Sequence, residues 1–335
     1  MATMREVAER AGVSMTTVSH VINETRFVSE ELVERVKAAI TALDYKPDQR
    51  ARSLRTGSTK TLGVLVSDIA NPFFPKVVRG IEDCAREDGY SVLLANTDES
   101  ATAEELNLSL MLERRVDGLI VAPSVGDAES LGNLIQRDTP MVMIDRCSEL
   151  PMDQVCSENE QGAYDATKHL IDLGHTRIGA IVEMEDIETF HARILGWRRA
   201  LSEAGLAEHS GDVRQAGLEV EGAYAAARAL LSGDDPVSAI FGTNNLMTLG
   251  VFRYLKDAGI PCPQAVSVVG FDDADWASAF NPSITSVAQR PYQMGYQATK
   301  LLLVRLQHPH RPPRRISLPC ELRIRESTAS AAVSS

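Results

Sequence analysis

The pattern of apolar and polar positions over residues 1–57 predicts three short helices. The first begins with a Thr-x-x-Glu capping box at Thr3, carries apolar residues at helical spacing and ends at Gly12. The second is expected over residues 15–23, and the third starts at Ser29 with acidic residues in its first turn. Three helices with a glycine turn between the first two indicate a helix-turn-helix domain.

From residue 61 onward, short apolar runs alternate with helical stretches. Strands that are apolar on both faces and alternate with helices form parallel sheets covered by helices. The runs divide into two groups near Asn159, which predicts an α/β body of two doubly wound, parallel-sheet lobes with a cleft at the strand ends. The seven expected strands lie at residues 62–66, 92–95, 118–121, 141–144, 177–182, 239–241 and 266–269.

The segment between these two patterns is too short to be a stable helix by itself. Lys46-Pro47 ends the third helix, and residues 49–55 form an amphipathic stretch, marginal as a free helix. We expect it to order only on a partner surface. The chain is therefore divided into a helix-turn-helix DNA-binding head (1–46), a hinge helix and linker (47–60), a two-lobed effector-binding and dimerisation domain (61–328) and a disordered tail (329–335).

The outward face of the second helix carries short polar side chains, where a solvated helix usually carries Glu and Lys. Hydroxyl groups such as those of Thr16 and Thr17 allow close approach to phosphates, and His20 can reach a base edge. Charge supports a nucleic-acid partner for this domain: residues 1–60 carry a balance of +2, although the whole chain carries −12.

Composition and cysteine spacing disfavour a membrane protein, a secreted protein and a metal-binding protein. With 44% hydrophobic and 24% charged residues the chain is ordinary for a globular protein, and it contains no apolar run of the roughly 20 residues that a membrane span needs. The N-terminus lacks a signal peptide, so we expect a cytoplasmic protein without a membrane partner. The five cysteines show no metal spacing and are expected to be free thiols. We therefore expect no metal and no cofactor.

Polar and aromatic residues follow the expected strands of the body. Rings that stack on C–H faces, together with planar Asn, Asp and Arg groups that share hydroxyls, are typical of a sugar site. Individually, an Asp after a strand is usually a helix cap and paired Phe residues are usually core, so the prediction rests on their joint placement at strand ends. The candidate effector-binding residues are Asn71, Phe73, Phe74, Asp145, Arg146, Arg193, Asn244, Asp272 and Gln289.

An enzyme of the doubly wound class is disfavoured. Such an enzyme would carry a glycine-rich phosphate loop after its first strand, and residues 67–71 contain no glycine. The G-x-S-x-G elbow of hydrolases is also missing from the sequence. We therefore expect a binding protein with no catalytic residues.

Residues 3–23 resemble the head of the lactose/galactose repressor family, and residues 25–30 resemble its purine- and ribose-repressor branch. The resemblance implies that Met15, Thr16 and His20 read the major groove. It further implies that Leu54 inserts into the central minor groove as a wedge, with Arg55 beside it. Residues that the family would use to hold phosphates or make a further DNA contact are Ser14, Thr17, Asn23, Arg26 and Tyr45.

The body resembles the periplasmic-binding-protein-like core of the same family, and the nine candidate effector residues fall where its ribose-binding relatives place ligand contacts. The resemblance implies a homodimer on a palindromic operator, repressing an operon for carbohydrate uptake or catabolism. The implied effector is a sugar, with a pentose such as ribose as the first choice and induction as its expected effect. A sugar-binding protein and a purine-responsive, corepressed regulator remain the alternatives.

Overall fold

The computed structural model describes residues 2–23, 26–45, 57–124 and 139–331, which form two compact units, Met1–Thr59 and Lys60–Ser335. The predicted hinge residues Leu54 and Arg55, and the last four residues of the predicted tail, lie outside the described residues. None of the helices in the described part of the chain combines the length and apolarity needed to cross a bilayer.

The head unit consists, within residues 2–45, of α1 (Met4–Ala11), α2 (Met15–Asn23) and α3 (Glu30–Ala42). The predicted capping box is present, since Thr3 Oγ1 accepts from the Glu6 N–H and the Glu6 carboxylate accepts from the Thr3 N–H. Gly12 takes the left-handed conformation, with φ of 63°. These local signals place the three helices around a small apolar core that includes Val7, Val18 and Val36.

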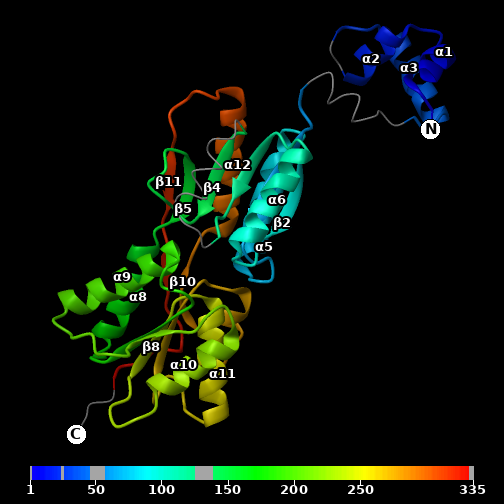
Figure 1. Ribbon diagram of the computed structural model, residues 1–335. Coiled ribbons are helices and arrows are strands. Elements are labelled where there is room, and N and C mark those ends of the chain that lie inside the picture. The colour runs from blue at the N-terminus through cyan, green and yellow to red at the C-terminus, as the bar shows by residue number, and fades with distance from the viewer. Residues whose placement is uncertain (1, 24–25, 46–56, 125–138, 332–335) are drawn as a thin grey trace. The chain divides into compact units, whose positions relative to one another are not determined.

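The described residues of the body form two six-stranded sheets, one in each lobe (Figure 1). The N-lobe sheet has the order β11-β5-β4-β3-β1-β2, and all of its pairings are parallel. Its strands are β1 (Thr61–Val66), β2 (Ser91–Asn96), β3 (Gly118–Val121), β4 (Met141–Asp145), β5 (Asp153–Ser157) and β11 (Arg315–Leu318). Helices α5 (Phe73–Glu87) and α12 (Pro291–Gln307) cover one face and α6 (Ala101–Glu113) covers the other.

The C-lobe sheet has the order β12-β10-β9-β8-β6-β7, and only the β10–β12 pair is antiparallel. Its strands are β6 (Ile178–Val182), β7 (Val213–Gln215), β8 (Ala239–Gly242), β9 (Ser267–Phe271), β10 (Thr285–Ala288) and β12 (Glu321–Arg323). Helices α8 (Asn159–Asp172) and α9 (Glu188–Glu203) cover one face; α10 (Val220–Leu230) and α11 (Asn245–Ala258) cover the other, and a short 3-10 helix spans Asp275–Ser278.

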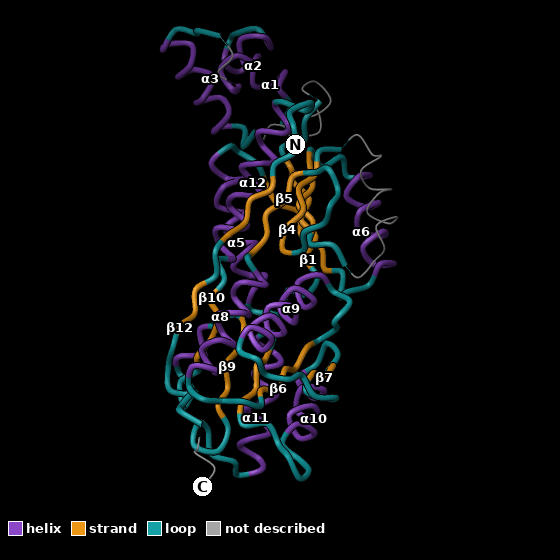
Figure 2. The backbone as a smooth tube through the Cα atoms, turned by 90° about the vertical axis from the view of Figure 1, so that its left-hand side faces the viewer, coloured by secondary structure: helices purple, strands orange, loops and turns teal. Residues whose placement is uncertain are grey.

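The expected fold class, a helical head followed by two parallel-sheet lobes, is confirmed. The chain passes from the first lobe to the second before α8, at the division predicted near Asn159. It returns after β10 to add α12 and β11 to the N-lobe, and crosses a third time to β12 (Figures 1 and 2). These returns, together with short or polar segments, add strands that the apolar pattern did not predict: β5, β7, β10, β11 and β12.

Glycine allows two helix pairs to pack with their backbones in contact. A Cβ atom at Gly80 of α5 would overlap the Tyr292 carbonyl oxygen of α12, and one at Gly196 of α9 would overlap the Glu160 carbonyl oxygen of α8. The α5–α12 contact joins segments more than 200 residues apart in sequence, so it fastens the returning helix to the N-lobe.

The expectation of five free thiols is wrong for two of them. Cys147 and Cys156 form a disulfide, with Cα atoms 6.1 Å apart. The physical reason is the pairing of strands in the sheet. β4 and β5 are hydrogen-bonded neighbours in which Asp145 is in register with Cys156, so Cys147, just after the end of β4, lies close to Cys156. Cys84, Cys262 and Cys320 are free.

Candidate functional site

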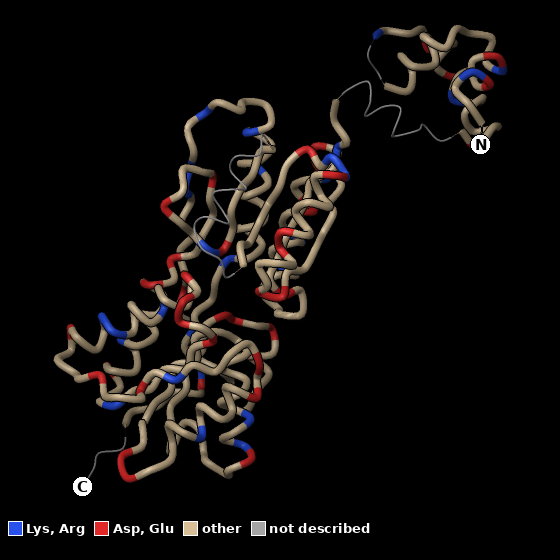
Figure 3. Tube along the Cα trace, in the orientation of Figure 1, with Lys and Arg blue, Asp and Glu red and all other residues tan. Residues whose placement is uncertain are grey.

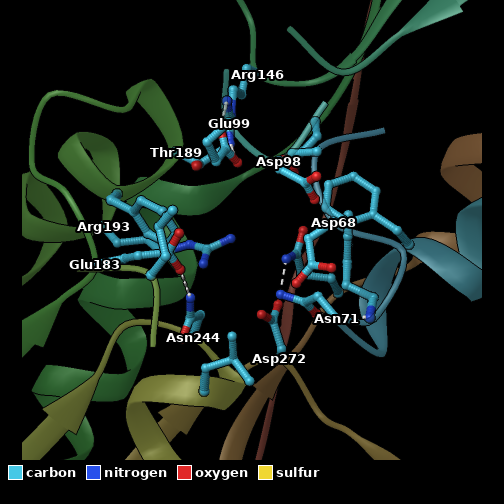
Figure 4. A pocket seen from close by; sticks show the side chains of 18 residues that line it. Asp68, Asn71, Asp98, Glu99, Arg146, Glu183, Thr189, Arg193, Asn244 and Asp272 are labelled. Atoms are coloured by element: carbon cyan, nitrogen blue, oxygen red, sulfur yellow. Dashed lines mark hydrogen bonds and ion pairs between the residues drawn. The ribbon is translucent and has the colours of Figure 1, made fainter. Parts of the chain in front are cut away.

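A cavity of about 250 Å³ lies in the body at the carboxyl ends of strands from both sheets (Figure 4). The structure brings all nine candidate effector residues together in its lining: Asn71, Phe73, Phe74, Asp145, Arg146, Arg193, Asn244, Asp272 and Gln289. Sequence reasoning did not select Ser67, Asp68, Asp98, Glu99, Glu183, Thr189, Phe190, Leu218 and Leu246, which also line it. Ligand binding by these residues stays a prediction.

The placement follows from parallel-strand geometry, because the carboxyl ends of neighbouring strands meet at one edge of a sheet. Asp145 ends β4 and Asp272 directly follows β9, the corresponding position of the other lobe. Both have a positive φ, 68° and 69°, a conformation that Asp tolerates better than most residues and that concentrates at functional sites. The backbone therefore turns each carboxylate toward the cavity.

Arg146 is held by the protein and has little freedom to meet a ligand. Its guanidinium makes a two-pronged ion pair with Glu99, at 2.7 Å from Nη1 to Oε2, and Nη1 also donates to the Pro123 carbonyl oxygen. Both side chains are more than nine-tenths buried. A buried Arg–carboxylate fork of this kind is geometrically specific and strongly bonded.

Arg193 lies on α9 with only 3% of its surface exposed. Its Nε donates to Asn159 Oδ1 at 2.9 Å, Nη1 donates to the Thr243 carbonyl oxygen at 2.6 Å, and the guanidinium lies 3.8 Å from the centre of the Phe271 ring. Its Nη2 group donates to none of the described residues. The stacked guanidinium therefore presents one amino group for a ligand oxygen.

Two predicted ligand residues are held by other side chains in the cavity wall. Asn244 caps α11 by accepting from the Met247 N–H at 2.8 Å, and its amide nitrogen donates to Glu183. Gln289 Nε2 donates to Asp272 Oδ1 at 2.6 Å. Burial raises the pKa of the Glu183 carboxyl to about 7, and the negative charge of Glu99 adds to the effect.

The two lobes touch at the cavity through Asn71, whose Oδ1 accepts from Asn245 Nδ2 at 3.0 Å and from the Phe73 N–H at 3.1 Å. Beside this contact, Phe73 and Phe74 meet edge to face with ring centres 5.1 Å apart. Apolar ring edges and polar side chains therefore share one wall, which is the composition of a site for a small polar molecule.

The overlooked lining residues carry a signal that sequence could have supplied. Asp98 and Glu99 come two and three residues after β2, and Glu183 directly follows β6. The strand-end rule that selected Asp145 applies equally to them. An acidic residue between a strand and a helix is also the usual helix cap, so sequence alone does not distinguish the two roles.

In the head, α2 exposes the side chains expected to read bases. Met15 is 54% exposed, Thr16 is exposed and His20 is half-buried. Ser14 caps the helix, with its Oγ accepting from the Thr17 N–H at 3.1 Å and lying 2.9 Å from Thr17 Oγ1. The start of α2 is therefore both locally ordered and accessible.

The residues expected to hold phosphates differ in accessibility. Arg26 is exposed, Asn23 is half-buried and donates to the Ser19 carbonyl oxygen at 2.8 Å, and Tyr45 is 9% exposed within the head core. Because only 9% of Tyr45 is exposed, little of its surface can meet DNA. These assignments stay predictions.

Comparison with known proteins identifies both units. Residues 3–48 match the model of the bacterial regulatory proteins of the lacI family, and residues 167–328 match the periplasmic binding protein-like domain. The HTH-type transcriptional repressor PurR of Photobacterium profundum is 38% identical over 329 residues, covering 98% of this chain and 98% of that protein. The chain belongs to the lacI family of bacterial regulatory proteins.

Solved structures of the lacI family agree. The lac repressor dimer bound to operator and the anti-inducer ONPF superimposes with a TM-score of 0.90 at 26% identity, covering 98% of this chain and 99% of that one. A lacI-family regulator from Enterococcus faecium with bound ribose has a TM-score of 0.73 at 32% identity, covering 81% of this chain and 100% of that one. The resemblance to this family, and to its purine and ribose branch, is confirmed. Its members are transcription regulators, and the helix-turn-helix head is the DNA-binding part.

Proposed function

We propose that this lacI-family protein represses transcription as a homodimer on a palindromic operator, and that a small hydroxyl-rich molecule in the body cavity controls its operator affinity. The observation that carries the proposal is the gathering of the nine predicted effector residues in one cavity of a chain that also carries a helix-turn-helix head. Because its DNA partner lies in the cytoplasm, the protein would act there.

On the operator, α2 enters the major groove with Met15, Thr16 and His20 toward the base edges. The exposed Met15 side chain suits apolar contact with a thymine methyl group. Leu54 is assigned as the minor-groove wedge and Arg55 as its neighbour on the strength of sequence alone.

For the effector, a sugar such as a pentose is the first candidate. Arg193 offers a free amino group, Asp145 and Asp272 offer acceptors and Phe73 offers a ring, which together suit a ring bearing several hydroxyls. The ribose-bound relative supports this assignment and, with it, the proposed role in a carbohydrate operon. The PurR relatives support a second candidate, a purine that acts as corepressor.

The homodimer is proposed to form through the edge of the N-lobe. Leu93 and Leu94 of the edge strand β2 are 38% and 39% exposed, and Leu106 and Leu110 of the adjoining α6 are 61% and 46% exposed (Figure 1). Exposed large apolar side chains that gather on one edge strand and its adjoining helix are typical of an interface. A two-fold pairing of this surface would present two heads to a palindromic site.

The test starts by selecting operator sequences from random duplex DNA with the full chain at fixed salt, because phosphate contacts make affinity salt-dependent. Operator affinity is then measured with and without D-ribose, other sugars, hypoxanthine and guanine. A sugar that lowers affinity about tenfold, roughly 1.4 kcal/mol of coupling, supports induction by a sugar. A purine that raises affinity supports corepression. Failure to select any palindrome would contradict the proposed function.

Two variants separate the DNA contacts. Thr16→Ala is expected to relax preference at one operator position and weaken specific binding by about 1–3 kcal/mol, with the exposed α3 variant Thr41→Ala as control. Leu54→Ala is expected to weaken specific binding far more than nonspecific binding. An equal loss of both would rule out the wedge.

A further inference from the structure

Carboxylates outnumber cationic side chains among the described residues that line the effector cavity. Its lining carries six carboxylates and two guanidiniums, without a lysine. The acidic members are Asp68, Asp98, Glu99, Asp145, Glu183 and Asp272. Figure 3 shows acidic positions gathered where the two lobes meet.

The two guanidiniums do not offset this charge. Arg146 is occupied by its fork with Glu99 and by the Pro123 carbonyl oxygen. Arg193 is the remaining cation, and two of its three donor groups are bonded to Asn159 and Thr243. Among the described lining residues, five carboxyl groups therefore remain against one guanidinium, and burial raises the pKa of two of them, Asp145 and Glu183.

Asp145 is the clearest unmet acceptor. It is buried, with only 7% of its surface exposed, and it lines the cavity. None of the described residues donates a hydrogen bond to its carboxylate. Burial raises the pKa of the Asp145 carboxyl, because its ionised form lacks hydrogen-bond partners among the described residues of the cavity, and a ligand that donates to it would supply the missing partner.

Glu183, which belongs to the C-lobe, is likewise a buried carboxyl group with few hydrogen-bond donors. It also has only 7% of its surface exposed, and its one hydrogen-bond donor among the described residues is the Asn244 amide. Burial and the charge of Glu99 raise the pKa of its carboxyl to about 7. A positive group in the cavity would favour the ionised form of this carboxyl.

The described carboxylates of the cavity are not arranged to bind a metal ion. No group of three His, Cys, Asp or Glu side chains in the described part of the chain is placed to hold one metal ion. The carboxylates surround the cavity instead of converging on a point (Figure 4). Its volume of about 250 Å³ lies below the roughly 300–1,000 Å³ of sites for drug-sized ligands, which suits a single sugar-sized ring.

We propose that the effector of this protein is a monosaccharide-sized polyhydroxylated molecule carrying a cationic nitrogen, such as an amino sugar. This assignment rests on the proposed function and narrows its ligand class. Arg193 and Phe73 hold the neutral, hydroxyl-bearing part of the ring. The protonated amine lies inside the ring of carboxylates, where Asp145 of the N-lobe and Glu183 of the C-lobe attract its charge.

The test is calorimetric titration of the full chain with matched pairs of probes that differ in one amino group: D-glucosamine against D-glucose, and D-galactosamine against D-galactose. We expect at least one amino sugar to bind about tenfold or more tightly than its neutral parent, the effect of a hydrogen bond to a charged group. Equal or tighter binding of the neutral parents overturns the proposal, and so does a lack of binding by both amino sugars.

Isosteric variants test which carboxyl groups of the cavity interact with the amine of the ligand. Glu183→Gln keeps an oxygen for the Asn244 amide, and Asp145→Asn suits the same positive φ. We expect each to weaken binding of the amino sugar about tenfold more than it weakens binding of the neutral parent. Glu221→Gln, whose carboxylate pairs with Arg253 outside the cavity, is the control and should change neither. Equal losses for amino sugar and parent in both cavity variants overturn the proposal.

Operator binding distinguishes this inference from the proposed function. If D-glucosamine binds with the expected charge dependence but leaves operator affinity unchanged, the ligand class stands and control of operator affinity by the cavity fails. If D-ribose or another neutral sugar alone binds and shifts operator affinity, the proposed function stands and the cationic ligand is refuted.

Discussion

Replacing Glu183 with glutamine is expected to remove a destabilisation of the body that grows with pH. Burial raises the pKa of this carboxyl from 4.5 to about 7 in the folded protein, so the folded state binds the proton more tightly than the unfolded chain. Stability contributed by the proton is present at low pH and falls as the pH rises between these two values. The side chain of glutamine does not titrate, so the stability of the Glu183→Gln variant lacks this dependence on pH.

The magnitude follows from the two pKa values. The difference between 4.5 and about 7, at about 1.4 kcal/mol per pKa unit, gives an upper limit of about 3 kcal/mol, reached when the pH exceeds the folded pKa. At pH 5 only about 1 kcal/mol of this is expressed, because the folded carboxyl is still protonated. The advantage of Glu183→Gln over the native protein should therefore grow by about 2–3 kcal/mol between pH 5 and pH 8.

Charged neighbours set the size of the effect. Glu99 raises the Glu183 pKa, whereas Asn244, Arg146 and Arg193 lower it, so a variant at any of these would shift the same profile. Urea unfolding at several pH values gives the free energy of unfolding. Trp197, fully buried in the C-lobe, is a fluorescent reporter. Glu221→Gln is the control, and a stability difference for Glu183→Gln that stays constant from pH 5 to pH 8 would refute the reasoning.

Three further changes test packing and assembly. Asp153→Asn should destabilise the body by about 3–5 kcal/mol in urea unfolding, because the fully buried carboxylate accepts from two arginines that would lose their counter-charge; an unchanged midpoint would contradict this. Gly196→Ala should lower the melting temperature and reduce the free energy of unfolding by about 1–3 kcal/mol, because its Cβ would overlap the Glu160 carbonyl oxygen. Ser202→Ala, on the exposed side of the same helix, is the control and should not lower it. Leu106→Glu should shift the protein toward monomer in sedimentation; a dimer of unchanged stability would exclude this face as the interface.

Local signals predicted the head well because they act within a few residues. The capping box at Thr3, the left-handed Gly12 and the Ser14 cap each involve neighbours in sequence, so the bounds of α2 agree with the expected 15–23. The position of Tyr45 could not be read in the same way. Its burial depends on packing against helices earlier in the chain.

In the body, the apolar pattern predicted strands that are buried on both faces and missed those that are short or polar. β5 (Asp153–Ser157) is fully buried although it contains Asp, Gln and Ser, and its burial comes from neighbouring strands on both sides. Cys156 therefore meets Cys147 only once β4 and β5 pair, a contact that cysteine spacing does not indicate. The returning elements α12 and β11 are likewise defined by tertiary contacts.

The strand-end rule placed residues such as Asp145 and Asp272 in one cavity because it depends only on parallel topology, whereas Arg193 reaches the same cavity from α9. The balance of charge in that cavity depends on both lobes at once. Whether Arg146 is available to a ligand is decided by Glu99, which lies after a different strand, and this pairing leaves no trace in the order of residues. The sequence could therefore predict which residues line the cavity but not how their charges are paired.

Under the proposed function, this dependence on both lobes would give the cavity a means of regulation. Asp145 belongs to the N-lobe and Asp272 to the C-lobe, and the charge of Asp272 disfavours ionisation of Asp145. Bringing the lobes closer around an empty cavity shortens the distance between like charges in a poorly screened interior, which opposes closure. A cationic ligand reverses the sign of that interaction and therefore binds the closed arrangement more tightly than the open one. Such a difference in affinity between two arrangements is what a ligand needs in order to shift a conformational equilibrium.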